Sequence, residues 1–171
     1  MLDTVRCDER YWKILRQCKT ADYVQFWGLL VASVSVESVK NVQVRVEAGE
    51  HSWIGDEPPE IGDGAGPGPY DLLLGALGSC MTMTLLMYAR RKEWPLEKVE
   101  VDIQHDRIHA DDAANVESSG GMVEHFKIDL VLHGDLDEAQ LERLSDISTR
   151  CPVRKTLAGT HVFHETARLA G

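Results

Sequence analysis

The sequence predicts an α+β domain with an antiparallel sheet, and three observations favour this class. Segments that alternate apolar and polar residues, as half-exposed strands do, lie both before and after one long apolar helix. A shorter amphipathic helix follows the later strands. The length of 171 residues suits one domain with a substantial core. We therefore expect an N-terminal extension or extra helix over residues 1–30 and a single folded domain over residues 31–171.

The first strands are predicted from a change of pattern after residue 30. Valines alternate with polar residues in two short runs, which indicates two strands joined in a hairpin that turns near Lys40 and Asn41. The runs consist of Val34 and Val36, then Val42, Val44 and Val46. The segment that follows, residues 54–70, is rich in glycine, proline and acidic residues and is predicted to be a loop.

The long helix is predicted over residues 70–94, with Pro69 just ahead of it and Pro95 just after it. Its apolar residues cover nearly the whole circumference, which is typical of a buried helix. Two glycines inside a helix cost roughly 1 kcal/mol each relative to alanine. We infer that another helix or a second subunit packs closely along the side that carries the small residues Gly75, Gly78, Ser79 and Thr82.

The second half of the chain alternates again and then ends in helices. Residues 96–108 and 124–136 are predicted strands, separated by a polar loop. Asp137 is the expected N-cap of a helix that runs to about residue 150. A short helix should begin at Pro152, and residues 160–170 form a plausible last strand.

Composition and charge exclude several functions. Hydrophobic residues make up 43% and charged residues 27% of the chain, as in ordinary globular proteins. The formal net charge of −10 argues against nucleic-acid binding, which needs clustered Lys and Arg. We find no convincing signal peptide and no apolar run that looks long enough to span a bilayer. The expected location is cytoplasmic, with no membrane partner.

The four cysteines, Cys7, Cys18, Cys80 and Cys151, are too widely spaced for a zinc ribbon or a dense disulfide framework. Two histidine pairs, His105 with His109 and His161 with His164, also have poor spacing for metal ligands. On a strand, residues three apart point to opposite faces. We expect neither a metal nor a cofactor.

The segment "CPVRKTL" at residues 151–157 suggests a reactive thiol. Proline suits the first position of a helix, so Cys151 would be the N-cap. The positive end of the helix dipole and the adjacent Arg154 and Lys155 should each lower the thiol pKa and favour the reactive thiolate. The alternative is that Cys151 is simply a small apolar residue at a helix start.

Two stretches together resemble the OsmC/Ohr family, the osmotically inducible and organic-hydroperoxide-resistance proteins. They are "GPGPYDLLLGALGSC", which ends at Cys80, and "CPVRKTL", in which Arg154 stands where histidine is frequent. The likeness runs from about Val42 to Ala167 and is greater to the OsmC-like branch than to the core Ohr enzymes. It implies an intertwined homodimer whose antiparallel sheets wrap around long, buried, paired helices.

The resemblance also implies a thiol-based reduction of organic hydroperoxides at the subunit interface. By position, Cys80 is the residue that attacks the peroxide and becomes a sulfenic acid. Cys151 then condenses with it to a disulfide, which a dithiol reductant opens. The apolar surroundings of Cys80 favour lipid-derived hydroperoxides as substrates. The alternative is a dimeric ligand-binding or redox-sensing protein that uses the same cleft without peroxidase turnover.

An apolar helix is a poor environment for a thiolate, so Cys80 needs a nearby cation. The family uses an arginine held by a glutamate. The glutamate position, ten residues before the first cysteine, is Tyr70 here, and Asp71 is one residue later. Arg45 is the candidate arginine, although an ordinary solvated strand residue is the alternative. Arg154 is a second candidate cation.

Overall fold

The computed structural model describes residues 32–112 and 121–169, so the predicted N-terminal extension lies outside the described residues. Within those ranges the elements follow the order β1-β2-β3-α3-β4-η1-β5-α4-α5, where η1 is a single 3₁₀ turn at Ala110–Asp112. The two sheets are both antiparallel. This confirms the α+β class predicted from the sequence.

The first sheet has three strands in the order β1-β2-β3, with bounds Ser35–Lys40, Gln43–Ala48 and His51–Gly55. The predicted hairpin is confirmed, and its turn places Asn41 at a φ of 52°, a left-handed conformation that asparagine tolerates. Strand β3 was missed because its five residues show no repeated apolar alternation. The available signal was Gly49, whose φ of 61° lets the chain turn back directly after β2.

The loop between β3 and the long helix is organised around one carboxylate. Asp56 is buried, and its side chain accepts backbone N–H groups from Glu57, Asp63 and Ala65 at 2.9, 3.1 and 2.9 Å. These hydrogen bonds, led by the one from Ala65, hold the pKa of Asp56 below its usual value against the opposing effect of burial. A loop rich in glycine and proline thereby acquires a defined shape just before the helix.

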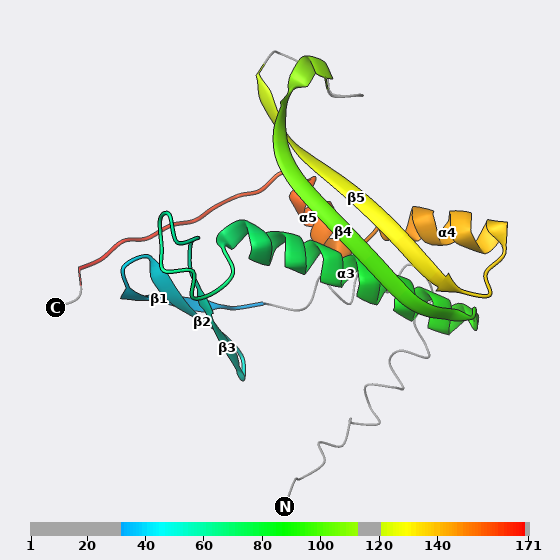
Figure 1. Cartoon of the computed structure of the whole chain (residues 1–171), viewed down its shortest axis with the longest axis horizontal. Helices are drawn as coiled ribbons and strands as arrows, with labels where there is room; N and C mark the ends of the chain where they lie inside the picture. Colours follow the sequence, from blue (N-terminus) through cyan, green and yellow to red (C-terminus); the bar gives the residue numbers. More distant parts are fainter. Residues whose placement is uncertain (1–31, 113–120, 170–171) are drawn as a thin grey trace, which may run out of the picture.

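Helix α3 spans Pro69–Lys92 and is the central element of the chain (Figure 1). Pro69 occupies the first turn, and the helix ends at Glu93, whose φ is 57°. Four residues at intervals of four form its buried side, namely Leu77, Met81, Leu85 and Ala89. The helix was predicted to be buried all round, but in the single chain its other side remains partly open.

Strands β4 (Leu96–His109) and β5 (Met122–Gly134) form a long hairpin that crosses α3 (Figure 1). Alternate residues of both strands turn toward the helix, which explains the period-two pattern in the sequence. Helix α4 (Glu138–Ser148) begins at Asp137, whose side chain accepts the Gln140 N–H as predicted for an N-cap. Helices α4 and α5 (Pro152–Leu157) both pack against α3.

The core is divided into two clusters along α3. One cluster joins Leu85 and Ala89 of α3 to Leu144 and Ile147 of α4. The other joins Leu77 and Met81 to Cys151 at the start of α5. Inward residues of β4 and β5 cover both clusters. The same helix therefore supports α4 at one end and α5 nearer its middle.

The predicted last strand is not present in the described part of the chain. Residues 160–169 adopt no regular structure and are exposed, with Val162 and Phe163 each 79% accessible. A strand needs a neighbouring edge that supplies hydrogen bonds, and this segment extends away from α5 without pairing to one (Figure 1). Local alternation was therefore insufficient to make it a strand in the single chain.

We expected no segment to be long and apolar enough to span a bilayer. This expectation was wrong by the criteria of length and composition. Among the described residues, one helix, α3, has a window with a mean hydropathy of 1.7 and is long enough to cross a membrane. Glycine, serine and threonine interrupt its apolar residues, which hid the run in the sequence. A core helix meets the same criterion, and α3 packs against β4, α4 and α5 as a core helix does.

Candidate functional site

The fold brings two cysteines that are far apart in sequence into one apolar cluster. Cys80 lies near the middle of α3, and Cys151 lies at the start of α5. Both are free thiols, Cys80 half-buried and Cys151 fully buried. Their side chains belong to the same core cluster, and Cys80 is one of the groups that raise the pKa of Cys151. The cluster around them is formed by Leu77, Met81, Val101, Ile103, Phe126, Ile128, Val153 and Leu157.

Cys151 is the N-cap of α5, as the sequence predicts. Pro152 occupies the first helical position, and the Cys151 sulfur accepts the backbone N–H of Arg154 at 3.3 Å. The Cys151 carbonyl accepts the N–H of Lys155 at 3.1 Å, which closes the first turn. The local geometry thus holds the sulfur where backbone donors converge.

The predicted lowering of the Cys151 pKa was wrong. Burial raises the pKa of the Cys151 thiol to about 11, more than the Arg154 hydrogen bond lowers it. The neighbouring Cys80 raises it further, through its charge and a hydrogen bond, and the Arg154 charge lowers it. The sequence revealed the helix start and the cations but not that this sulfur has no exposure to water. Desolvation dominates because little solvent remains to stabilise the thiolate.

Among the predicted cations, the structure places Arg154 beside the sulfurs. Its backbone N–H contacts Cys151, and its charge acts on the same thiol. Arg45 lies on β2 in the separate three-stranded sheet, half-exposed, with a guanidinium nitrogen 3.6 Å from a carboxylate oxygen of Glu37. In the single chain, Arg45 therefore has a partner of its own on the neighbouring strand, and its role near Cys80 stays a prediction.

The residues at the family glutamate position have other contacts in the single chain. The Asp71 carboxylate accepts the Gly68 N–H at 3.0 Å and so caps the start of α3. The Tyr70 ring stacks on the His105 ring, with centroids 4.9 Å apart. The Asp71 carboxylate therefore caps the start of α3, and the Tyr70 ring stacks on another aromatic ring.

One polar group on the inward face was missed from the sequence. His105 is two residues beyond Ile103 on β4, and its ring lies 4.8 Å from the ring of Phe126 in the sulfur cluster. Its Nε2 atom is 2.6 Å from a Glu124 carboxylate oxygen. The available signal was the alternation of Val101, Ile103 and His105, which places the histidine on the same face as the apolar residues.

A groove of about 480 Å³ lies between α3 and β4. Neither Cys80 nor Cys151 lines it. Its walls are the small residues that the sequence placed on one side of the helix, together with two residues of β4. These are Leu74, Gly75, Gly78, Ser79, Thr82, Met83, Val101 and Ile103. Val101 and Ile103 line the groove and also belong to the cluster around the two cysteines, so the two features adjoin each other.

A comparison of the sequence with models of protein families finds a match. Residues 62–166 match the model of the OsmC-like protein family, which is more than half of the chain and includes both Cys80 and Cys151. The chain belongs to the OsmC-like family. Among curated protein sequences, none matches this OsmC-like protein.

Solved structures share the fold of this OsmC-like protein at low sequence identity. The OsmC-like protein from Mycoplasma pneumoniae is 18% identical with a TM-score of 0.62, and the match covers 77% of this chain and 89% of that one. The organic hydroperoxide resistance protein OsmC from Legionella pneumophila is 19% identical, with a TM-score of 0.56 and coverages of 77% and 91%. OhrB, the organic hydroperoxide resistance protein of Bacillus subtilis, is 18% identical, with a TM-score of 0.53 and coverages of 77% and 93%.

The burial difference between the two thiols predicts selective alkylation. At pH 8, a thiol with a pKa of about 11 is ionised in roughly one molecule in a thousand. Iodoacetamide should therefore label half-exposed Cys80 well before Cys151 in the folded, reduced protein. Labelling of Cys151 should rise steeply only above about pH 10. Peptide mass spectrometry over a pH series measures both rates, with the unfolded protein in denaturant as control. Equal labelling of the two cysteines at pH 8 would contradict this account.

Proposed function

We propose that this OsmC-like protein reduces organic hydroperoxides with the Cys80 and Cys151 pair. The observation that carries the proposal is the packing of Cys80 and Cys151 into one apolar cluster, with the Arg154 N–H bonded to the Cys151 sulfur. Paired thiols of this kind can form and open a disulfide without large movement. Apolar walls suit a hydrophobic hydroperoxide. The substrate class, a dithiol reductant and a cytoplasmic location are parts of this proposal.

The first step is the attack of the Cys80 thiolate on the terminal peroxide oxygen. The O–O bond breaks, the sulfur becomes a sulfenic acid, and the leaving alkoxide takes a proton and departs as the alcohol. Cys80 is suited to this role because it is the more accessible of the two sulfurs. Arg154 supports the site through its N–H bond to the Cys151 sulfur and through its charge, which lowers the pKa of Cys151.

The second step is the condensation of Cys151 with the sulfenic acid, which forms the disulfide and releases water. The Arg154 N–H already points at the Cys151 sulfur and can stabilise the developing thiolate. A dithiol then reduces the disulfide and regenerates both thiols.

The contacts of the residues expected to activate Cys80 support a second function. The residues expected to activate Cys80 have other contacts, Asp71 with the Gly68 N–H and Arg45 with Glu37. A chain without that activation favours slow, single oxidation over turnover. The alternative proposal is therefore a redox-sensing or ligand-binding member of the family, in which the same pair oxidises once.

The homodimer is also a proposal, and it is supported by the open side of α3. A Cβ atom on Gly75 would meet no atom of the described chain within 4 Å, so nothing in the single chain explains the glycine. Met83 on the same side is 56% exposed, and the groove runs between them. Exposed valines on β1 add to the uncovered apolar surface. A second copy against this face would account for these features.

Turnover should depend on both cysteines. With cumene hydroperoxide and excess dithiothreitol, the wild-type protein should consume peroxide continuously. Cys80→Ser should lower the rate at least a hundredfold, because no sulfenic acid can form. Cys151→Ser should lower the rate, because the Cys80 sulfenic acid must then be reduced directly by dithiothreitol without a Cys80–Cys151 disulfide. Cys7→Ser and Cys18→Ser are the matched controls and should keep the wild-type rate.

The two proposed functions are separated by the same assay. Stoichiometric loss of one peroxide per chain, followed by no further consumption with fresh dithiothreitol, would favour the redox sensor. Full turnover in Cys80→Ser would contradict both proposals.

Replacing Gly75 with leucine should separate folding from dimerisation. The single chain leaves the space around a Cβ atom at this position open, and leucine improves helix propensity by roughly 1 kcal/mol. If a second copy packs at this position, Gly75→Leu should weaken the dimer at least tenfold while the thermal midpoint of the monomer does not fall. Sedimentation velocity over a concentration series measures the dissociation constant, with Gly75→Ala as the conservative control. A Gly75→Leu dimer as tight as the wild type would place the interface elsewhere.

A further inference from the structure

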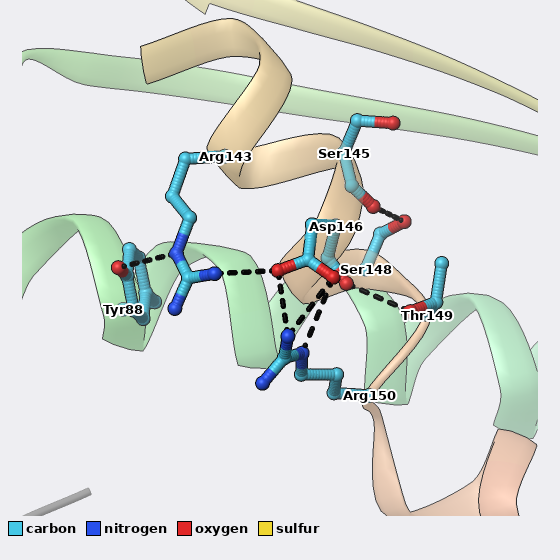
Figure 2. A network of polar contacts seen from close by, with 7 residues as sticks. All are labelled: Tyr88, Arg143, Ser145, Asp146, Ser148, Thr149 and Arg150. Atoms are coloured by element: carbon cyan, nitrogen blue, oxygen red, sulfur yellow. Dashed lines mark hydrogen bonds and ion pairs between the residues drawn. The ribbon is translucent and has the colours of Figure 1, made fainter. Parts of the chain in front are cut away.

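A network of charged and polar side chains links α4 to α3 beside the core cluster of Leu85 and Leu144 (Figure 2). Its centre is Asp146, in the last turn of α4, which lies between two arginines. The Arg143 side chain donates to an Asp146 oxygen at 2.6 Å. The Arg150 guanidinium donates to both Asp146 oxygens, with nitrogen–oxygen distances of 2.8 and 3.1 Å from Nη2 and 3.3 Å from Nε. One carboxylate therefore holds both arginines.

The network reaches the central helix through Tyr88. The Nε atom of Arg143 donates to the Tyr88 hydroxyl oxygen at 3.1 Å, and Figure 2 shows the guanidinium between this hydroxyl and the carboxylate. The Tyr88 ring is fixed in turn by an edge contact with Trp94, at a centroid distance of 5.6 Å, and by Arg91 at 5.2 Å. The acceptor on α3 thus has a defined position.

The two ends of the network lie on the chain segments that carry the two cysteines. Arg150 is the residue immediately before Cys151, so its bonds to Asp146 act on the corner between α4 and α5. Tyr88 is two helical turns after Cys80 on α3, about 12 Å along the axis. The Thr149 hydroxyl also bonds to the Asp146 carbonyl at 2.8 Å, which tightens the same corner. The chain from Tyr88 to Arg150 therefore connects the elements that carry the sulfurs.

We propose that Asp146 is a positioning residue that, through Arg143, Arg150 and Tyr88, sets the placement of Cys151 against Cys80. The inference rests on the proposed redox pairing of these cysteines. The network does not touch the sulfurs and takes no part in the chemistry. It restrains the position of the α4–α5 corner relative to α3. The Cys151 sulfur therefore stays close to the Cys80 sulfur before a disulfide forms.

The expected effect is modest because the side chains are partly exposed. Exposed ion pairs contribute little individually, whereas bidentate and networked pairs contribute more. Removing the Asp146 carboxylate should lower the effective concentration of one thiol toward the other by about two- to fivefold. A change of that size is measurable as a redox equilibrium.

The test is an equilibrium with glutathione and does not depend on peroxide. Reduced protein reacts with glutathione disulfide to give the Cys80–Cys151 disulfide and two molecules of reduced glutathione. At half-oxidation, the squared concentration of reduced glutathione divided by the concentration of glutathione disulfide gives the effective concentration. Asp146→Asn keeps the size of the side chain and removes its charge. Tyr88→Phe removes only the acceptor on α3 and leaves the contact between Asp146 of α4 and Arg150, just after α4, intact.

Both variants should lower the effective concentration by about two- to fivefold relative to the wild type. The matched control is Glu100→Gln, which removes a carboxylate that pairs with Lys98 and His133 on the β4–β5 hairpin, away from the sulfur cluster. It should keep the wild-type equilibrium. Circular dichroism at the same temperature establishes that each variant is folded, and Tyr88→Phe decides the matter if Asp146→Asn does not fold.

The outcomes separate this inference from the proposed function. A wild-type protein that never forms the Cys80–Cys151 disulfide would overturn the redox pairing itself. A wild-type disulfide with the same equilibrium in Tyr88→Phe and Glu100→Gln would overturn the positioning role of the network. An effect in Asp146→Asn alone would also overturn it, because Asp146 would then only stabilise the last turn of α4.

Discussion

The contact between α3 and the start of α5 is the constraint on which the site depends. It buries the Cys151 sulfur completely and places it against Cys80. Two physical effects act on this sulfur in opposite directions. The helix start offers backbone donors and positive charge, whereas burial removes the water that would stabilise a thiolate. Burial dominates, and the thiol is therefore held in its protonated form in the reduced protein.

The difference in burial gives the Cys80 and Cys151 thiols different properties, although the two groups are chemically identical. The Cys80 thiol is partly accessible and can react with a small molecule, whereas the Cys151 thiol beside it is buried. The rest of the fold supports that arrangement. The inward residues of the β4–β5 hairpin exclude water above α3, the capped corner between α4 and α5 directs the second sulfur, and the loop around Asp56 leads the chain into the helix.

Local signals in the sequence predicted much of this fold. The N-caps at Asp137 and Cys151 and the alternation in both long strands depend on neighbours a few residues away, and the structure confirms them. The family signatures around the two cysteines predicted the fold through resemblance. What failed depends on distant contacts. The pKa of Cys151 is set by residues of α3 and β5, and residues 160–169 lack a strand edge to join. Neither the histidine beside Phe126 nor the Asp146 network could be located without the packing of separate elements.

The most direct measurement is to identify which sulfur atoms become bonded after oxidation. The reduced protein is treated with one equivalent of an organic hydroperoxide, blocked with an alkylating agent and digested without reductant, and the peptides are identified by mass spectrometry. The account predicts a single disulfide between Cys80 and Cys151, with Cys7 and Cys18 still alkylated as thiols. Cys80 found as a sulfinic acid beside an unreacted Cys151, or a disulfide from Cys80 to either N-terminal cysteine, would contradict it.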